Sequence, residues 1–432
     1  MLRSMVHRRI VGLSLFTLAL LCQPGCGGGG GGGGTVGGLP VAPDPTCSVI
    51  QPAVHLQTAA QIQARLHENI IVPATSIEHA SDIGIRAHTN HLILATTTRG
   101  VGPQGFTPSG LDTAYNVPPN GGAGAIALVD AFNYPTALND FNVFSNQFSL
   151  PAESSSDVTA SSNAVFRVVY ATGVKPVDDG GWAQESALDT QWAHAMAPHA
   201  KIYLVEAASA SLDDLAHAAN VAKALPGVKQ VVMSFGATET ACEFATFDKF
   251  FLQNGVTFYS AAGDDAGNQD YPGESKNVVC CGGTTLNVNS NGTWASETAW
   301  NGTACGVSQF EPRPLFQNVV FSLVGKFRGA CDIAADGDPA TGVSVFDSTI
   351  FGGVSGWQVF GGTSSSAPIL AGIANTALEA HASSQAQNTV FYSEIGGSNL
   401  HDVTSGSSGG LNAGAGWDFP TGVGSPNGIG GF

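Results

Sequence analysis

Short apolar runs that alternate with helical stretches constrain the fold of this chain more than any other feature. Runs of four or five mostly apolar residues have the length of buried strands, and strands alternating with helices form parallel sheets. We therefore predict an α/β fold with a doubly wound, mostly parallel sheet flanked by helices, and functional groups at the carboxyl ends of its strands. The expected strands are residues 125–129, 201–205, 230–233 and 256–260, and the expected helices are residues 187–197, 212–225 and 243–253.

The first 26 residues have the pattern of an export signal. Three arginines precede an apolar run at residues 10–21, which is too short to span a bilayer as a helix. Cys26 follows a small residue and precedes an unbroken glycine run at residues 27–34, as at the start of a bacterial lipoprotein. We expect export to the cell envelope or the extracellular space, with either lipid attachment at Cys26 or cleavage and release.

Composition divides the rest of the chain into three parts. Glycine and proline dominate directly after the signal, as in a flexible linker. A small N-terminal segment follows, with a helix-like stretch near residues 58–67 and a strand-like stretch at residues 92–97. The expected boundaries are residues 1–26 for the signal, 27–46 for the linker, 47–105 for the small segment and 106–432 for the main domain.

The charge of the chain excludes one class of partner. Its formal net charge is −17, and only 11% of its residues are charged. Nucleic-acid binding needs clusters of Lys and Arg, which this sequence lacks. We therefore expect no nucleic-acid partner.

Six cysteines remain after the signal, which is an even number in a chain expected to be exported. This number favours disulfides, although the adjacent Cys280 and Cys281 also suit buried thiols. The six are Cys47, Cys242, Cys280, Cys281, Cys305 and Cys331.

One serine and two acidic residues predict acyl-transfer chemistry. Ser364 begins a helical stretch, where its hydroxyl and nearby backbone N–H groups can serve catalysis, although serine is also a common N-cap. Glu185 and Asp189 are four residues apart and lie on one face of an otherwise apolar helix. Two adjacent carboxyls share a proton, which suits Glu185 as general base and Asp189 as the residue that orients it. A solvated helix face is the alternative explanation. A carboxyl base indicates catalysis in acid, where histidine would be protonated.

Two further acidic positions are candidates for site residues. Asp264 follows the expected strand at residues 256–260, and in its protonated form it could donate to an oxyanion; a turn aspartate is the alternative. Asp402-Val403 and residues 414–418 could supply two carboxylates and several backbone carbonyls. Such an all-oxygen set suits calcium, although a glycine-rich turn with capping aspartates explains the same residues.

Together these elements resemble the sedolisins, the serine-carboxyl peptidases with a subtilisin-like fold. The resemblance runs from Phe106 to the C-terminus. Its motifs, in order, are Phe106-Thr107-Pro108 with Ala114-Tyr115, Glu185 with Asp189, Ser234-Phe235-Gly236, Gly263-Asp264, Gly282-Gly283-Thr284, Gly362-Thr363-Ser364 and the set from Asp402 to Asp418.

The resemblance implies a role for each candidate residue. Ser364 would be the nucleophile, Glu185 the base, Asp189 its partner and Asp264 the oxyanion donor. One structural calcium ion would be bound by the side chains of Asp402 and Asp418 and the carbonyls of Val403, Gly414 and Gly416.

The sequence departs from the sedolisin pattern at two places. Sedolisins are generally made with a large N-terminal pro-domain, and residues 47–105 are too few for one. Phe235 stands where tryptophan is more usual, which bears on the substrate cleft.

We predict an exported, acid-acting, monomeric serine endopeptidase that hydrolyses polypeptides through a Ser-Glu-Asp triad and an acyl-enzyme. Two alternatives stay open. Asp130, after the first expected strand, could begin a subtilisin-type Asp-His-Ser triad, but the next histidine is His194, on the helix of Glu185. The chain could also be an inactive peptidase-like surface binding protein held by its glycine tether.

Overall fold

The computed structural model of this protein describes residues 56–66, 69–95 and 102–432. The predicted signal and linker, with Cys26 and Cys47, lie outside the described residues. Residues 44–432 group into one compact unit. In the described part of the chain, no helix combines the length and the apolar character needed to cross a bilayer.

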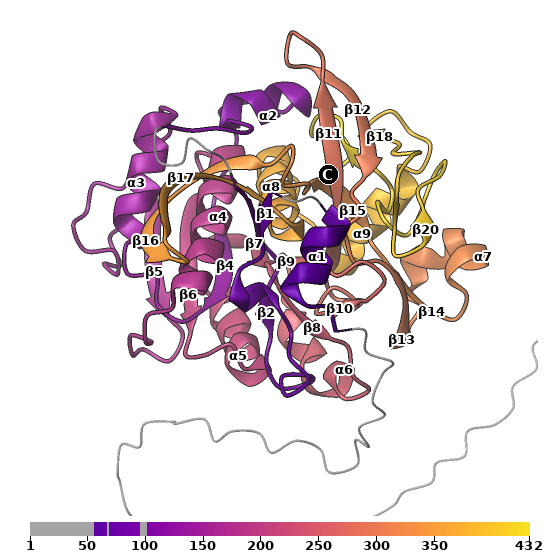
Figure 1. The fold of residues 1–432 in the computed structure, drawn as a ribbon, viewed down its shortest axis with the longest axis horizontal. Coiled ribbons are helices and arrows are strands. Elements are labelled where there is room, and N and C mark those ends of the chain that lie inside the picture. Colours follow the sequence, from indigo (N-terminus) through magenta and orange to yellow (C-terminus); the bar gives the residue numbers. More distant parts are fainter. Residues whose placement is uncertain (1–55, 67–68, 96–101) are drawn as a thin grey trace, which may run out of the picture. The chain divides into compact units, whose positions relative to one another are not determined.

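The main sheet confirms the predicted α/β architecture (Figure 1). Its strands follow the order β12-β11-β9-β7-β4-β6-β5, with β15 pairing with residues 281–284 of β11. Every pair is parallel except β11 with β12, so seven strands share one direction. The bounds are β4 (Ala125–Ala131), β5 (Phe166–Tyr170), β6 (Lys201–Ala207), β7 (Val228–Met233), β9 (Thr257–Ala261), β11 (Val279–Val288), β12 (Trp294–Ala299) and β15 (Ile333–Asp336).

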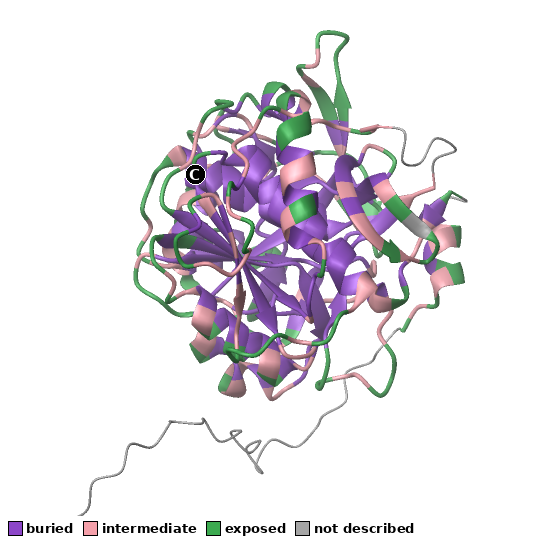
Figure 2. Ribbon diagram, turned by 90° about the vertical axis from the view of Figure 1, so that its left-hand side faces the viewer, coloured by how far each residue is buried: buried purple, intermediate pink, exposed green. Residues whose placement is uncertain are grey.

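Helices cover both faces of this sheet. Side chains of β4 alternate between two cores: Ile126 packs with α3, α4 and α8, whereas Ala127 packs with α5. This alternation is the period of two that a strand imposes, and it explains why β4 is apolar from Ala125 to Val129; Asp130 near its end is the exception. Figure 2 shows the buried sheet and helices at the centre of the molecule. The bounds are α3 (Ala137–Gln147), α4 (Gly180–Met196), α5 (Leu212–Ala222) and α8 (Thr363–Ala377).

Helix α4 is buried on every side. All its residues from Gly181 to Met196 are buried, and the Asp179 side chain caps its start by accepting hydrogen bonds from two backbone N–H groups. A helix in such a place is expected to be apolar all round. Its two carboxyl side chains, those of Glu185 and Asp189, are therefore exceptions that need a reason.

The third expected helix, at residues 243–253, does not form as one element. It consists of α6 (Glu243–Thr246) followed by a 3-10 turn at Asp248–Phe251. Phe247 and Phe251 turn inward and pack in the core of the α5 face, so tertiary packing overrides the weak helix propensity of this phenylalanine-rich stretch.

The small N-terminal segment pairs with strands of the main domain. After α1 (Ala59–Leu66), strand β2 (His88–Thr89) extends the sheet β10-β8-β2, and β3 (Leu92–Leu94) joins the sheet β1-β3-β17-β16. Both pairings to the main domain are antiparallel. The partner strands are β1 (Ile70–Ile71), β8 (Phe235–Thr238), β10 (Asp270–Tyr271), β16 (Val343–Phe351) and β17 (Val354–Gly361).

The remaining elements lie at the periphery of the sheet and toward the C-terminus. They are α2 (Pro108–Ala114), α7 (Phe321–Val324), α9 (Ser384–Ser393), β13 (Gly306–Pro312), β14 (Phe327–Ala330), β18 (Leu400–His401), β19 (Ser407–Ser408), β20 (Leu411–Asn412) and β21 (Ser425–Pro426).

Among the described residues, four of the five cysteines are not in disulfides. Cys242 is disulfide-bonded, but Cys280, Cys281, Cys305 and Cys331 are buried free thiols. The expectation of disulfides is therefore wrong for these four, which pack among apolar residues of the interior and act as small apolar side chains.

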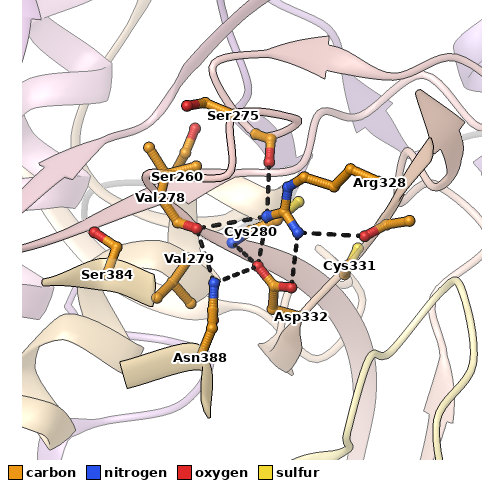
Figure 3. A network of polar contacts seen from close by, with 12 residues as sticks. Ser260, Ser275, Val278, Val279, Cys280, Arg328, Cys331, Asp332, Ser384 and Asn388 are labelled. Atoms are coloured by element: carbon orange, nitrogen blue, oxygen red, sulfur yellow. Dashed lines mark hydrogen bonds and ion pairs between the residues drawn. The ribbon is translucent and has the colours of Figure 1, made fainter. Parts of the chain in front are cut away.

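Arg328 and Asp332 form a buried ion pair within a network of polar contacts (Figure 3). Arg328 of β14 donates to both oxygens of Asp332, at 2.6 and 3.0 Å, and neither side chain is exposed. Asp332 also accepts hydrogen bonds from the Cys280 backbone and the Asn388 amide. The pair thereby links β14, β11 and α9 at the point where β15 begins.

Strand β15 in turn holds the first turn of α8. The Ala335 N–H donates to Ser366 Oγ at 3.1 Å, and Ser365 Oγ donates to the Asp336 carbonyl at 2.7 Å. The position of Ser364, which lies next to these two serines, therefore depends on strand β15 and on the ion pair before it.

Loss of one member of this pair should strongly destabilise the fold. Asp332→Ala leaves the Arg328 charge buried and unpaired, which should lower the free energy of unfolding by about 3–5 kcal/mol in urea unfolding followed by circular dichroism. Lys175→Ala is the matched control, because the Lys175–Asp178 pair is exposed and should contribute little. Equal losses in the two variants would contradict the importance of the buried pair.

Candidate active site

Ser364 is the second residue of α8 and is fully buried. The helix begins after Gly362, which has a φ of 98°. A Cβ atom at Gly362 would lie 2.4 Å from Asp264 Oδ2 and 2.2 Å from the Asn90 carbonyl oxygen, so only glycine fits. Ser364 Oγ donates to the Ser234 carbonyl at 2.9 Å.

Asp264 lies directly beside this helix start, three residues after β9 ends. Its Oδ1 accepts hydrogen bonds from the Thr363 N–H at 2.7 Å and the Thr363 hydroxyl at 2.9 Å. Its Oδ2 is buried and has no hydrogen-bond partner among the described residues. Burial raises the pKa of Asp264 to about 8, although the bonds from Thr363 lower it. Asp264 is therefore neutral in acid, with Oδ2 free to carry the proton.

The carboxyls of Glu185 and Asp189 do lie together in the interior, and Asp130 joins them. All three side chains are fully buried. Burial, and then the charges of Asp130 and Glu185, raise the pKa of Asp189 well above its usual range. Burial and the Glu185 charge do the same for Asp130, at the end of β4. Three such carboxyls cannot all ionise, so they must share protons.

His91 also contacts this group, which the sequence did not indicate. Its Nδ1 lies 2.9 Å from Glu185 Oε2, and its ring stacks on Phe360. The Asn90 N–H donates to the same Glu185 oxygen at 3.1 Å. The sequence shows only that two histidines, His88 and His91, come shortly before an expected strand. This position does not predict which residues the histidines contact in the folded protein.

His194 is not placed to act as the histidine of a subtilisin-type triad. The Nε2 atom of His194 lies 2.8 Å from the Pro151 carbonyl, and its ring packs on Phe141. Burial lowers its pKa to about 4. His194 therefore does not connect Asp130 with Ser364, and Asp130 belongs to the carboxyl group instead.

The predicted calcium residues converge on one glycine-rich loop. The Gly416 N–H donates to both oxygens of Asp402, and the Gly414 N–H donates to Asp418 Oδ2 at 2.9 Å. Burial raises the pKa of Asp418 to about 6, and the nearby Asp402 charge contributes to this rise. Among the described residues no cluster of three or more His, Cys, Asp or Glu forms a metal site, so an ion here needs backbone oxygens as well. Two mutually repelling carboxylates at one loop fit a hard divalent cation.

Comparison with known proteins places the chain among peptidases. The model of the subtilase family matches residues 180–417. Sedolisin of Pseudomonas sp. (strain 101) is 35% identical over 202 residues, which cover 40% of this chain and 33% of sedolisin. Kumamolisin of Bacillus sp. (strain MN-32) is 34% identical over 300 residues, which cover 60% of this chain and 52% of kumamolisin. The chain thus spans between a third and about half of the length of these relatives.

A solved structure extends the likeness to most of the fold. Pseudomonas sedolisin, a serine-carboxyl proteinase complexed with two molecules of pseudo-iodotyrostatin, is similar with a TM-score of 0.62 and 28% sequence identity. The match covers 76% of this chain and 96% of that chain.

Proposed function

The chain belongs to the sedolisin family within the subtilase superfamily, and on this premise we propose that it is an exported serine endopeptidase that acts in acid. The observation that carries the proposal is the convergence of Ser364, Asp264 and Glu185 at one buried site. Glu185 helps to raise the pKa of Asp264, and Asp264 holds the backbone beside Ser364. A nucleophile, a neutral acid and proton-sharing carboxyls are the groups that acyl transfer in acid requires.

In the proposed reaction, Ser364 Oγ leaves its hydrogen bond to Ser234 and attacks the carbonyl carbon of the scissile peptide. Glu185 accepts the hydroxyl proton and returns it to the leaving amine, and Asp189 orients Glu185 through their shared proton. The Ser364 N–H and the protonated Asp264 Oδ2 stabilise the oxyanion. Water then hydrolyses the acyl-enzyme ester by the same proton transfers.

The substrates in this proposal are polypeptides, and the enzyme works as a monomer outside the cytoplasm. The export signal in residues 1–26 supports secretion, and Cys26 with the glycine run supports lipid attachment as one form of it.

We also propose one structural calcium ion at the glycine-rich loop. The carboxylates of Asp402 and Asp418 and the carbonyls of Val403, Gly414 and Gly416 would hold it. A bound ion would neutralise the repulsion between the two carboxylates and order a loop that has little apolar core of its own.

Replacement of the nucleophile tests the function directly. Ser364→Ala should lower kcat for hydrolysis of casein or a peptide at acid pH by at least about 10³-fold while the circular dichroism spectrum stays unchanged. Ser296→Ala, on the exposed end of β12, is the matched control and should keep full activity. Retained activity in a folded Ser364→Ala variant would show that another group is the nucleophile.

The role of Asp264 predicts a particular pH dependence. Only the neutral form of Asp264 can donate a hydrogen bond to the oxyanion. Activity should therefore fall as pH rises through the Asp264 pKa of about 8, rather than near the usual aspartate pKa of about 4. The amide of Asp264→Asn donates a hydrogen bond at every pH, so this variant should keep more activity than Asp264→Ala. The rate of Asp264→Ala should fall about 10²–10³-fold. The Asn variant should lose this ionisation, but its activity should still fall in alkali because Glu185 and Asp189 need their shared proton.

Profiles of kcat/KM against pH for the wild type and the two variants measure this effect. If the Asn and Ala variants are equally impaired and their alkaline limbs coincide with that of the wild type, Asp264 is a turn residue rather than an oxyanion donor.

Removal of calcium should lower the melting temperature. A ligand that binds only the native state contributes about 2.7 kcal/mol at a hundredfold excess over its dissociation constant. A chelator should therefore destabilise the wild type but have no further effect on Asp418→Ala. Asp213→Ala, on the exposed side of α5, should remain as sensitive to the chelator as the wild type. A wild type that does not respond to the chelator has no such site.

A further inference from the structure

An apolar patch on the surface of the main domain has no part in the proposed reaction. It is formed by a 3-10 helix at Leu315–Val320, helix α7 and the first residue of β14. Figure 1 shows α7 at the outer edge of the molecule, well away from α8. The exposed fractions of the five large side chains run from 40% to 84%, which is unusual for apolar residues so close together. The patch consists of Leu315, Val319, Phe321, Leu323 and Phe327.

The opposite side of the same segment is fixed to the interior. Phe316 and Val320 are buried in the core, and the centroid of the Phe316 ring lies 5.2 Å from that of Tyr392 in α9. The Gln317 side chain donates to the Gly329 carbonyl at 2.6 Å and accepts from the Gly329 N–H at 2.9 Å. Buried anchors thus alternate with exposed apolar side chains. The patch is therefore a fixed face of the fold, which cannot turn its apolar residues inward.

The charge around the patch is opposite to that of the whole chain. No Asp or Glu occurs from residue 312 to residue 331, whereas the formal net charge of the chain is −17. The half-buried Arg313 guanidinium lies over the Phe321 ring, 4.8 Å from the ring centroid. The Arg313 N–H donates to the carbonyl of the exposed Lys326 at 2.9 Å, so the two basic residues are neighbours. An apolar surface with basic side chains beside it suits a partner that carries negative groups above an apolar layer.

A second copy of this chain fits the patch poorly. In a two-fold contact the same surface meets itself, so Arg313 and Lys326 would meet an equally basic surface. The segment has no carboxylate to neutralise them, and like charges in an interface are costly. A lipid bilayer, in contrast, offers anionic headgroups to the basic side chains and acyl chains to the apolar ones.

We propose that this patch is a membrane-docking surface, which binds anionic phospholipid bilayers with its five apolar side chains at the boundary between headgroups and acyl chains. Arg313 and Lys326 pair with lipid phosphates. The negative remainder of the protein is repelled by such a surface, so this face alone approaches it. Lipid attachment at Cys26, proposed above, would hold the protein near a membrane, whereas the patch decides which face of the folded domain contacts the lipid.

Tryptophan fluorescence with brominated lipids tests which face enters the bilayer. We expect vesicles of equal parts phosphatidylglycerol and phosphatidylcholine, with brominated acyl chains, to quench full-chain Leu323→Trp more than the wild type. Ile350→Trp is the matched control, because Ile350 is exposed but lies outside the patch, and it should show no added quenching. An acyl anchor at Cys26 would be common to both variants, so it cannot produce this difference.

Further substitutions in Leu323→Trp separate the contributions of charge and apolar contact. Lys326→Gln should raise the lipid concentration for half-maximal quenching about fivefold, since a basic residue near an anionic surface contributes about this factor to binding. Lys175→Gln, at an exposed lysine outside the patch, should leave that concentration unchanged. Leu315→Ser combined with Val319→Ser should raise it at least about tenfold, with an unchanged circular dichroism spectrum.

Several results would overturn the docking surface. They are equal quenching of Leu323→Trp and Ile350→Trp, equal quenching with and without the two serines, and equal quenching in vesicles of phosphatidylcholine alone. If the wild type dimerises in sedimentation velocity and the two serines abolish the dimer, the patch is an interface between copies instead. Hydrolysis of a soluble peptide should be the same in all these variants, and its loss would show that the patch binds the polypeptide substrate rather than lipid.

Discussion

Carboxyl groups buried without a Lys or Arg partner are the constraint on which the rest of the site depends. Glu185, Asp189 and Asp130 are fully enclosed, and no Lys or Arg ion pair reaches any of them among the described residues. An isolated ionised carboxylate in such a place is very costly, so the group must keep protons. Helix α4 packs against both the sheet and α8, and an apolar helix in this place would avoid that cost. Burial of these carboxyls therefore lowers the free energy of unfolding at the place where the proposed base, Glu185, lies.

The parallel sheet brings the other groups to these carboxyls. Asp130 ends β4, Ser234 follows β7 and Asp264 follows β9, so their strands deliver all three to one edge. Carboxyl ends of parallel strands meet at the same edge, and the start of α8 lies there as well. The arrangement of the site therefore depends on strand order more than on any single loop, and the Arg328–Asp332 pair matters because it links β14, β11 and α9 at the point where β15 begins.

The N-terminal segment completes two of the smaller sheets of the main domain. Strand β2 pairs with β8, and β3 pairs with β17, so these two strand edges of the main domain are covered. An exposed strand edge tends to recruit another strand. The chain's own residues 88–94 therefore cover these two edges.

The sequence by itself determined the local features of this protein. The apolar runs identified β4, β6, β7 and β9, the spacing of Glu185 and Asp189 placed both on one helix face, and Gly362-Thr363-Ser364 marked a helix start. Each of these follows from contacts between residues close in the chain, where periodicity and capping decide. Tertiary structure alone decided that Asp130 joins the carboxyls, that four cysteines remain thiols, that residues 243–253 break, and that Asn90 and His91 lie at the site. Strands of two or three residues have too little periodicity to reveal their partners, and β2 pairs with β8 across more than a hundred residues of chain. Such a pairing is set by the shape and the free edges of the completed fold, which no local pattern contains.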